Sequence, residues 1–285
     1  MSEYESYSTC VVVLIINKIP ILPEIAMRSI LSNSKCNIYI GYVNEIDLEE
    51  LPQDKRINLI KLDGSGFKNT GYQDFTTFDF YSIVQLKWQL FEKVMNETSF
   101  EFIIYSDVDV LWMQNPIEHI GAVFKKYSNV RMLVQSDTRR PDFLVPCMGF
   151  VAFRNDPLSM KIIRDCRNLH IDMTDKGKKK IGDDEVMGYY VRESDDLNWY
   201  RELPQITFPI GAFTNVYNKK SLFPGLNQVS PFIFHANYTV GLERKLQMLG
   251  ILYRQYPNND FPMFKIPIKW RINEYLRIIK NRYSH

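Results

Sequence analysis

The chain has 285 residues, of which 45% are hydrophobic and 24% are charged, a composition typical of one large or two small globular domains. A formal net charge of +2 offers no general basis for nucleic-acid binding. Residues 1–8 are polar and acidic rather than a secretory signal, and no apolar run reaches the length of a membrane span. The 4 cysteines lack metal-binding spacing. We therefore expect a cytoplasmic protein with reduced thiols and no nucleic-acid partner.

Strands alternate with helices in the first part of the chain. The β-branched run 10–16 predicts a central parallel strand buried on both faces. Residues 22–31 predict an amphipathic helix, and runs 36–43 and 57–62 predict two further strands. This alternation favours a parallel α/β sheet of the nucleotide-binding type. The sequence contains no dinucleotide fingerprint and no P-loop, which disfavours a dehydrogenase or a P-loop enzyme.

Two aspartates follow the most apolar strand of the chain. A helix over 81–95 is expected to lead into the buried strand 102–105, after which come Asp107 and Asp109. On an extended backbone these two side chains point to the same side, where they repel each other unless a cation lies between them. Carboxylate oxygens suit Mg²⁺ or Mn²⁺. A solvated acidic turn is the alternative, but the flanking apolar residues favour a metal site that leaves positions open for phosphates.

The second half of the chain is predicted to continue the α/β pattern. The expected elements are a helix ending at 127, a strand 130–135, a strand 147–153, a helix 157–170 capped by Asn155 or Asp156, a helix starting at 182, extended pieces at 203–208 and 213–217, a strand 231–238 and a helix 243–252. Loops are expected at 67–80 and 174–180. Gly149 lies inside a strand, which often permits a close approach to the backbone.

Two further groups of residues are candidates for function. Asp183 and Asp184 lie at a helix start, where capping alone would explain them or where one would also be functional. His235, Gly241 and Lys245 have a spacing that can close over a metal-bound diphosphate, although a lone histidine at a strand end is usually only hydrogen-bonded.

Five segments in order resemble the nucleotide-diphospho-sugar transferase family, which comprises glycosyltransferases of the GT-A fold. They are Lys87-Trp88, 105–116 with its Asp-x-Asp, 146–155, 182–185 and 235–245. The resemblance implies one α/β domain of GT-A type over 1–285, with a mainly parallel central sheet flanked by helices. It implies a Rossmann-like nucleotide-sugar-binding half at about 9–116, an acceptor half at about 117–264 and a basic C-terminal helix at 265–285. That basic helix packs on the domain or touches an anionic membrane surface.

The resemblance also implies a role for individual residues. Asp107, Asp109 and His235 would hold Mn²⁺ or Mg²⁺, Asp107 would also contact the ribose, and residues 11–17 would line the uridine pocket. Gly241 and Lys245 would hold the diphosphate. The sugar would lie against Lys87, Gln135, Ser136 and Gly149. Asp184 or Asp183 would act as a base on the acceptor hydroxyl if the configuration inverts, or as a stabilising group if it is retained.

The function implied is transfer of a sugar, for which xylose or galactose is favoured, from a UDP-sugar to a hydroxyl of a glycan acceptor. Two alternatives stay open. A metal-dependent sugar nucleotidyltransferase would carry a Gly-rich basic loop after the first strand, which residues 17–20 match poorly. A non-catalytic carbohydrate-binding relative would have lost the cation ligands. Family members commonly carry a membrane anchor and stem that this sequence does not show, which favours a cytosolic, microbial or viral enzyme.

Overall fold

The computed structural model describes residues 7–16, 21–44, 51–64, 78–136, 145–177, 181–205, 207–211, 231–237, 239 and 241–255. In chain order the elements are β1 (Thr9–Leu14), α1 (Leu22–Asn33), β2 (Asn37–Tyr42), β3 (Ile57–Lys61), α2 (Phe78–Glu97), β4 (Phe102–Ser106), β5 (Val110–Trp112), α3 (Ile117–Lys126), β6 (Met132–Ser136), β7 (Pro146–Arg154), α4 (Pro157–Gly177), α5 (Asp183–Arg192), β8 (Tyr200–Glu202), β9 (Ile233–His235) and α6 (Leu242–Gln255). The alternating α/β order predicted from the sequence is confirmed.

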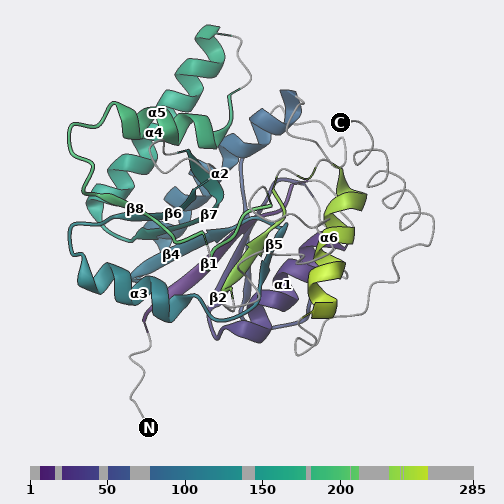
Figure 1. Cartoon of the computed structure of the whole chain (residues 1–285). Helices are drawn as coiled ribbons and strands as arrows, with labels where there is room; N and C mark the ends of the chain where they lie inside the picture. Colours follow the sequence, from purple (N-terminus) through teal and green to yellow (C-terminus); the bar gives the residue numbers. More distant parts are fainter. Residues whose placement is uncertain are drawn as a thin grey trace, which may run out of the picture.

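A seven-stranded sheet forms the centre of the protein, with strand order β3-β2-β1-β4-β7-β6-β8 (Figure 1). Its neighbouring strands are parallel except at β7, which runs antiparallel to both β4 and β6. A separate two-stranded sheet pairs β5 with β9 in antiparallel orientation. The predicted mainly parallel sheet is therefore present, and β7 is its one reversed strand among the described elements.

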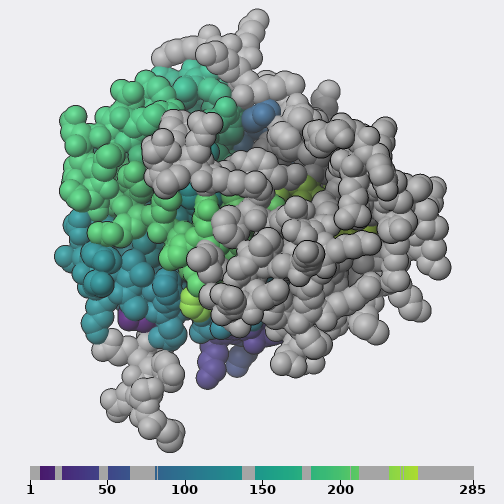
Figure 2. Space-filling model, in the orientation of Figure 1, coloured from purple at the N-terminus to yellow at the C-terminus, as the bar shows by residue number. Residues whose placement is uncertain are grey.

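Both faces of the central sheet are covered by helices, because its strands are apolar on both sides. Along β1, Cys10 and Val12 join one hydrophobic core, whereas Val11 and Val13 join the other. The first core includes side chains of α2, α4 and α5, and the second includes side chains of α1 and α3. The helices α4 and α5 form one side of the visible surface (Figure 2). This arrangement confirms that the first strand is central and buried on both faces.

Helix boundaries differ from the sequence predictions at two places. Helix α2 begins at Phe78, so the expected loop at 67–80 ends inside a helix, and its earlier part lies outside the described residues. Helix α4 continues to Gly177, so residues 174–177 are helical rather than a loop. Its start was predicted correctly, because the Asp156 carboxylate accepts the Ser159 N–H at 2.9 Å as a cap.

The expected extended piece at 203–208 is wrong. Strand β8 ends at Glu202, and Pro204 then opens a turn in which the Phe208 N–H donates to the Pro204 carbonyl at 2.8 Å. The expected pieces at 213–217 and 265–285 lie outside the described residues. Among the helices that the structure describes, none is long and apolar enough to cross a membrane.

Candidate active site

The two aspartates lie in a turn between two strands of different sheets. Strand β4 ends at Ser106, and the Val110 N–H donates to the Asp107 carbonyl at 3.1 Å, which closes the turn before β5 begins. The expected extended backbone at 107–109 is therefore wrong. Val108 still packs against the core, as predicted. The turn places both acids at the carboxyl end of β4, beside the carboxyl end of β1, where parallel α/β sheets bind ligands.

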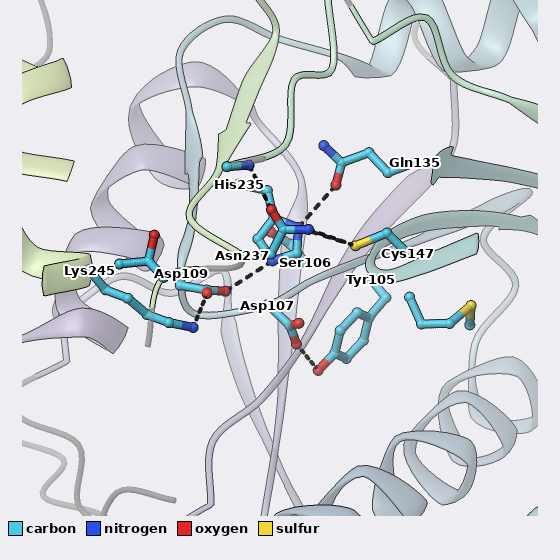
Figure 3. A network of polar contacts seen from close by, with 12 residues as sticks. Tyr105, Ser106, Asp107, Asp109, Gln135, Cys147, His235, Asn237 and Lys245 are labelled. Carbon is cyan, nitrogen blue, oxygen red and sulfur yellow. Dashed lines mark hydrogen bonds and ion pairs between the residues drawn. The ribbon is translucent and has the colours of Figure 1, made fainter. Parts of the chain in front are cut away.

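Three side chains predicted to bind a metal converge at this turn. Asp107, Asp109 and His235 each offer a ligand atom, and these atoms lie within 4.8 Å of one another. His235 reaches the acids because β9 pairs with β5, which sets it opposite Val110. Its Nε2 lies 3.3 Å from Asp109 Oδ1 (Figure 3). Two carboxylates and one imidazole form a donor set suitable for a divalent cation.

The far side of the histidine ring fixes its orientation. His235 Nδ1 lies 3.1 Å from Gln135 Oε1, and the Gln135 amide donates to the Phe208 and Pro209 carbonyls at 2.9 and 3.1 Å. The Cys147 thiol lies 3.5 Å from the same nitrogen. Because Nδ1 faces Gln135, Nε2 is left facing the acids. Gln135 is fully buried behind the histidine, a place that favours a positioning role over the predicted sugar contact.

Gly149 explains how these ligands come so close together. A Cβ at this position would lie 2.2 Å from His235 Cε1, 2.8 Å from His235 Nε2 and 2.7 Å from Asp107 Oδ2. Any other residue would push the histidine and the aspartate apart. The glycine therefore keeps open the space that the ligand atoms share, so the residues present fit a bound cation. The predicted close approach to this backbone is made by the ligand side chains themselves.

Asp109 is held by the start of α6. The Lys245 ammonium forms an ion pair with Asp109 Oδ2. Gly241 precedes this helix with a φ of 93°, a conformation that side chains rarely adopt, and its carbonyl accepts the Lys245 N–H at 3.2 Å. Burial disfavours the charged form of Asp109, but the neighbouring Lys245 ammonium and the contact with His235 outweigh burial and hold the pKa of Asp109 well below its usual range.

Asp107 is held from the opposite side of the turn. Its Oδ1 accepts the Tyr105 hydroxyl at 2.7 Å and lies 3.8 Å from the Lys87 ammonium. Lys87 is buried in α2, where it also donates to the Met148 carbonyl at 3.1 Å and forms an ion pair with Asp183. Desolvation raises the pKa of Asp107 although Lys87 opposes it. Burial disfavours charge on Lys87, but the neighbouring carboxylates outweigh burial and raise its pKa.

The predicted catalytic carboxylates lie at the first turn of α5. Asp183 is buried beside Lys87, and Asp184 Oδ1 accepts the Met148 N–H of β7 at 2.5 Å. Both acids therefore face the strand that carries Gly149. Ser136 is buried at the end of β6, and no contact between its side chain and the metal ligands is among the described interactions.

Two residues of this site, Tyr105 and Cys147, are not among the site residues predicted from the sequence. Tyr105 was assigned only to an apolar strand, although it stands two positions before Asp107 and therefore on the same side of the strand end. That period-two spacing was the available signal. Cys147 was assigned only to a buried strand, and nothing in its sequence context indicates that it meets His235.

Solved structures share this fold at low sequence identity. A glycosyltransferase named GlyE from Streptococcus pneumoniae TIGR4 matches with a TM-score of 0.52 and 15% identity over 94% of this chain. The chain spans 63% of the length of that structure. A glycosyltransferase involved in glycosylation of the major capsid of PBCV-1 matches with a TM-score of 0.51 and 12% identity, covering 84% of this chain and 98% of its own. No curated protein sequence matches. The α/β fold is thus of the GT-A type.

Residues 48–249 match the model of the nucleotide-diphospho-sugar transferase family. The matched segment includes all the residues predicted to hold the metal, the diphosphate and the sugar and both candidate catalytic aspartates, but not the predicted uridine-pocket residues 11–17. Because it covers most of the chain, the protein belongs to this family.

Proposed function

We propose that this protein is a metal-dependent glycosyltransferase that moves a sugar from a UDP-sugar to a hydroxyl of a glycan acceptor. The observation that carries the proposal is the convergence of Asp107, Asp109 and His235 at the end of β4, with Gly149 leaving room between them. Family membership makes a nucleotide-sugar the natural donor.

Asp107, Asp109 and His235 would hold Mn²⁺ or Mg²⁺. Gln135 supports this role because its contact with Nδ1 turns the Nε2 of His235 towards the carboxylates. When bound, the ion supplies a Lewis acid that neutralises the charge of the departing diphosphate. Asp107 is the more accessible acid, with a side chain 34% exposed against 7% for Asp109, and it is therefore the one assigned to the ribose as well.

Lys245 and Gly241 are assigned to the diphosphate. The Lys245 side chain is 19% exposed and its ammonium already lies at the metal ligands, so it can pair with a phosphate that approaches the same place. The nucleoside is assigned to the carboxyl end of β1, because ligands of parallel α/β sheets lie where neighbouring crossovers diverge. The side chains of Val11 and Val13 are core residues, so only the end of the segment 11–17 is suited to contact uridine.

The sugar is assigned to the space beside Lys87, Ser136 and Gly149, opposite the first turn of α5. In the transfer, the acceptor oxygen bonds to the anomeric carbon while the bond from that carbon to the diphosphate oxygen breaks. The proton of the acceptor hydroxyl passes to Asp184, or to Asp183, if the configuration inverts. If it is retained, the departing diphosphate oxygen takes the proton of the acceptor hydroxyl, and the same carboxylates stabilise the positive charge that develops on the sugar ring. The pairing of Asp183 with Lys87 makes Asp184 the first choice as base.

The proposal is tested by thermal shift with UDP, GDP and TDP, each with and without Mn²⁺. We expect UDP to raise the unfolding temperature only when Mn²⁺ is present, because the ion and the diphosphate share ligands. The Asp109→Ala variant is expected to lose the shift and the release of UDP from a UDP-sugar. No metal-dependent shift with any nucleotide, or full turnover in the Asp109→Ala variant, contradicts the proposal.

Once UDP binding is established, the donor sugar follows from product mass after incubation with UDP-xylose, UDP-galactose and UDP-arabinose. The anomeric proton signal of the product then gives the stereochemical outcome and separates a base from a stabilising role for Asp184. Absence of both Mn²⁺ binding and turnover of any donor would favour the non-catalytic carbohydrate-binding alternative, which is expected to lack the cation ligands.

A further inference from the structure

The two oxygens of the Asp107 carboxylate have different surroundings. Oδ1 accepts the Tyr105 hydroxyl at 2.7 Å and has the Lys87 ammonium 3.8 Å away. Oδ2 lies on the opposite side, since a Cβ on Gly149 would be 2.7 Å from Oδ2 and 2.8 Å from His235 Nε2. Only Oδ2 therefore faces the space that the histidine and the second aspartate share.

Tyr105 is rigidly placed for this contact. It is the penultimate residue of β4, it is 1% exposed as a whole residue, and its ring packs against Phe91 at a centroid distance of 5.6 Å. The Lys87 ammonium lies 4.3 Å from the centre of the same ring. The lysine is therefore held next to Tyr105, whose hydroxyl contacts the same oxygen of Asp107. Figure 3 shows the tyrosine pointing at Asp107 from the side away from Asp109. Oδ1 of Asp107 is thus held by contacts inside the protein, with Tyr105 and Lys87.

We infer that Tyr105 is a positioning residue that restricts Asp107 to a single metal-binding oxygen and thereby makes the site select Mn²⁺ or Mg²⁺ over Ca²⁺. Ca²⁺ takes about six to eight oxygen ligands and often binds both oxygens of one carboxylate, whereas Mg²⁺ needs near-ideal octahedral geometry with single oxygens. Octahedral oxygen sites suit Mn²⁺ as well. The inference rests on the proposed function, because it concerns the ion which that function requires.

The Tyr105→Phe variant tests this inference because it removes one hydroxyl and keeps the ring. Its matched control is Tyr190→Phe, since the Tyr190 hydroxyl also donates to an aspartate, Asp165 at 3.1 Å, away from the metal ligands. Binding of Mn²⁺ alone is measured from the electron paramagnetic resonance signal of the free ion, with Ca²⁺ and Mg²⁺ as competitors. The unfolding temperature of each variant confirms that it is folded.

We expect Tyr105→Phe to shift the ratio of Ca²⁺ to Mn²⁺ affinity towards Ca²⁺ by about 10-fold, a typical effect of losing a partner of a metal ligand. Tyr190→Phe is expected to leave the ratio unchanged. An unchanged ratio in folded Tyr105→Phe, with Mn²⁺ bound by the parent protein, overturns this inference and leaves the proposed function standing. Failure of the parent protein to bind Mn²⁺, with or without UDP, overturns both.

Discussion

Asp107 and Asp109 stand two residues apart, yet different parts of the chain hold them. The partners of Asp107 are Lys87 and Tyr105, which precede it on α2 and β4. The partners of Asp109 are His235 and Lys245, which come from β9 and α6 near the other end of the described chain. The Tyr105 contact spans 2 positions of sequence, whereas the Lys245 contact spans 136.

The two carboxylates differ in accessibility as well as in origin. Asp107 is 34% exposed at its side chain, and Asp109 is 7% exposed behind the start of α6. One acid therefore belongs to a site that the central sheet and α2 build by themselves, and the other is completed by a late segment. Because the two acids share a single ion in the proposed function, that ion would join the early and late parts of the chain.

The largest effect on the shared metal site is expected from the Gly149→Ala substitution. The added Cβ would lie 2.2 Å from His235 Cε1 and 2.7 Å from Asp107 Oδ2, so the two groups must separate. We expect Mn²⁺ affinity to fall by about 10- to 100-fold and the free energy of unfolding to fall by about 1–3 kcal/mol. Calorimetric titration and chemical denaturation measure the two effects.

A matched control is Gly188→Ala in α5. The Cβ there would meet Arg192 Nη1 at 3.4 Å and Pro146 Cδ at 3.5 Å, which are near-ordinary contacts. Alanine is also the better helix former by about 1 kcal/mol. This variant should bind Mn²⁺ like the parent protein. Equal metal affinity in both variants would show that the ligands do not need the space beside Gly149.

The Lys245→Met substitution changes the surroundings of Asp109 and not those of Asp107. Its expected effect on binding is smaller than that of Gly149→Ala. We expect affinity for UDP in the presence of Mn²⁺ to fall about 10-fold, since a charge-assisted contact to the diphosphate is lost. Affinity for Mn²⁺ alone should rise, because the ammonium no longer competes for Asp109. Calorimetric titration of Mn²⁺ with and without UDP gives both values and their coupling.

Lys161→Met is the control for Lys245→Met, because the Lys161 side chain is 67% exposed and its ammonium pairs with Asp165 on the surface of α4. It should leave both affinities unchanged. A Lys245→Met variant that binds Mn²⁺ alone less tightly than the parent would contradict the competition between lysine and ion.

The same contrast explains how far the sequence predicts this molecule. Features with a local cause were predicted correctly: the buried run of β1, the cap at Asp156, and two acids directly after β4. The reversed direction of β7 was not predicted, because an apolar strand has no residue pattern that encodes its orientation. The meeting of His235 with the acids was implied by family resemblance, and its cause, the pairing of β5 with β9, is a long-range contact.

Two details of the site show why local rules fail there. The turn at 107–109 contains neither glycine nor proline, so period-two spacing suggested an extended strand end. The place of Gln135 behind the histidine coincides with a register shift between Val134 and Gln135. A bulge of this kind changes where the following side chains point, and no turn residue in the sequence marks it.

The smallest expected effect is a dependence of stability on pH. It concerns only the part of the protein that supports Asp107. His170 of α4 accepts the Trp88 indole N–H on Nδ1 at 3.0 Å, so Nε2 carries the hydrogen and donates to the Ile181 carbonyl at 2.9 Å. Ile181 leads directly into the start of α5, where Asp183 pairs with Lys87. In a protonated imidazole Nδ1 would also carry a hydrogen, so it could no longer accept the Trp88 N–H.

Burial lowers the pKa of His170 below its usual value of about 6.5. The unfolded chain therefore binds more protons than the folded one just below that value, and stability is lost as the pH falls. We expect the free energy of unfolding to decrease by up to about 1.4 kcal/mol per pH unit for this group between pH 6.5 and its folded pKa. Denaturation of the parent and of His170→Leu across pH 5–8 measures it. The variant should be less stable at neutral pH but less sensitive to acid, whereas an identical pH slope in both would remove His170 as the cause.

His119→Leu is the control on the other face of the sheet. Burial also lowers the pKa of His119, but this residue packs around Phe208 and not at α5. Acid should therefore weaken the start of α5, which supports Lys87 and through it Asp107.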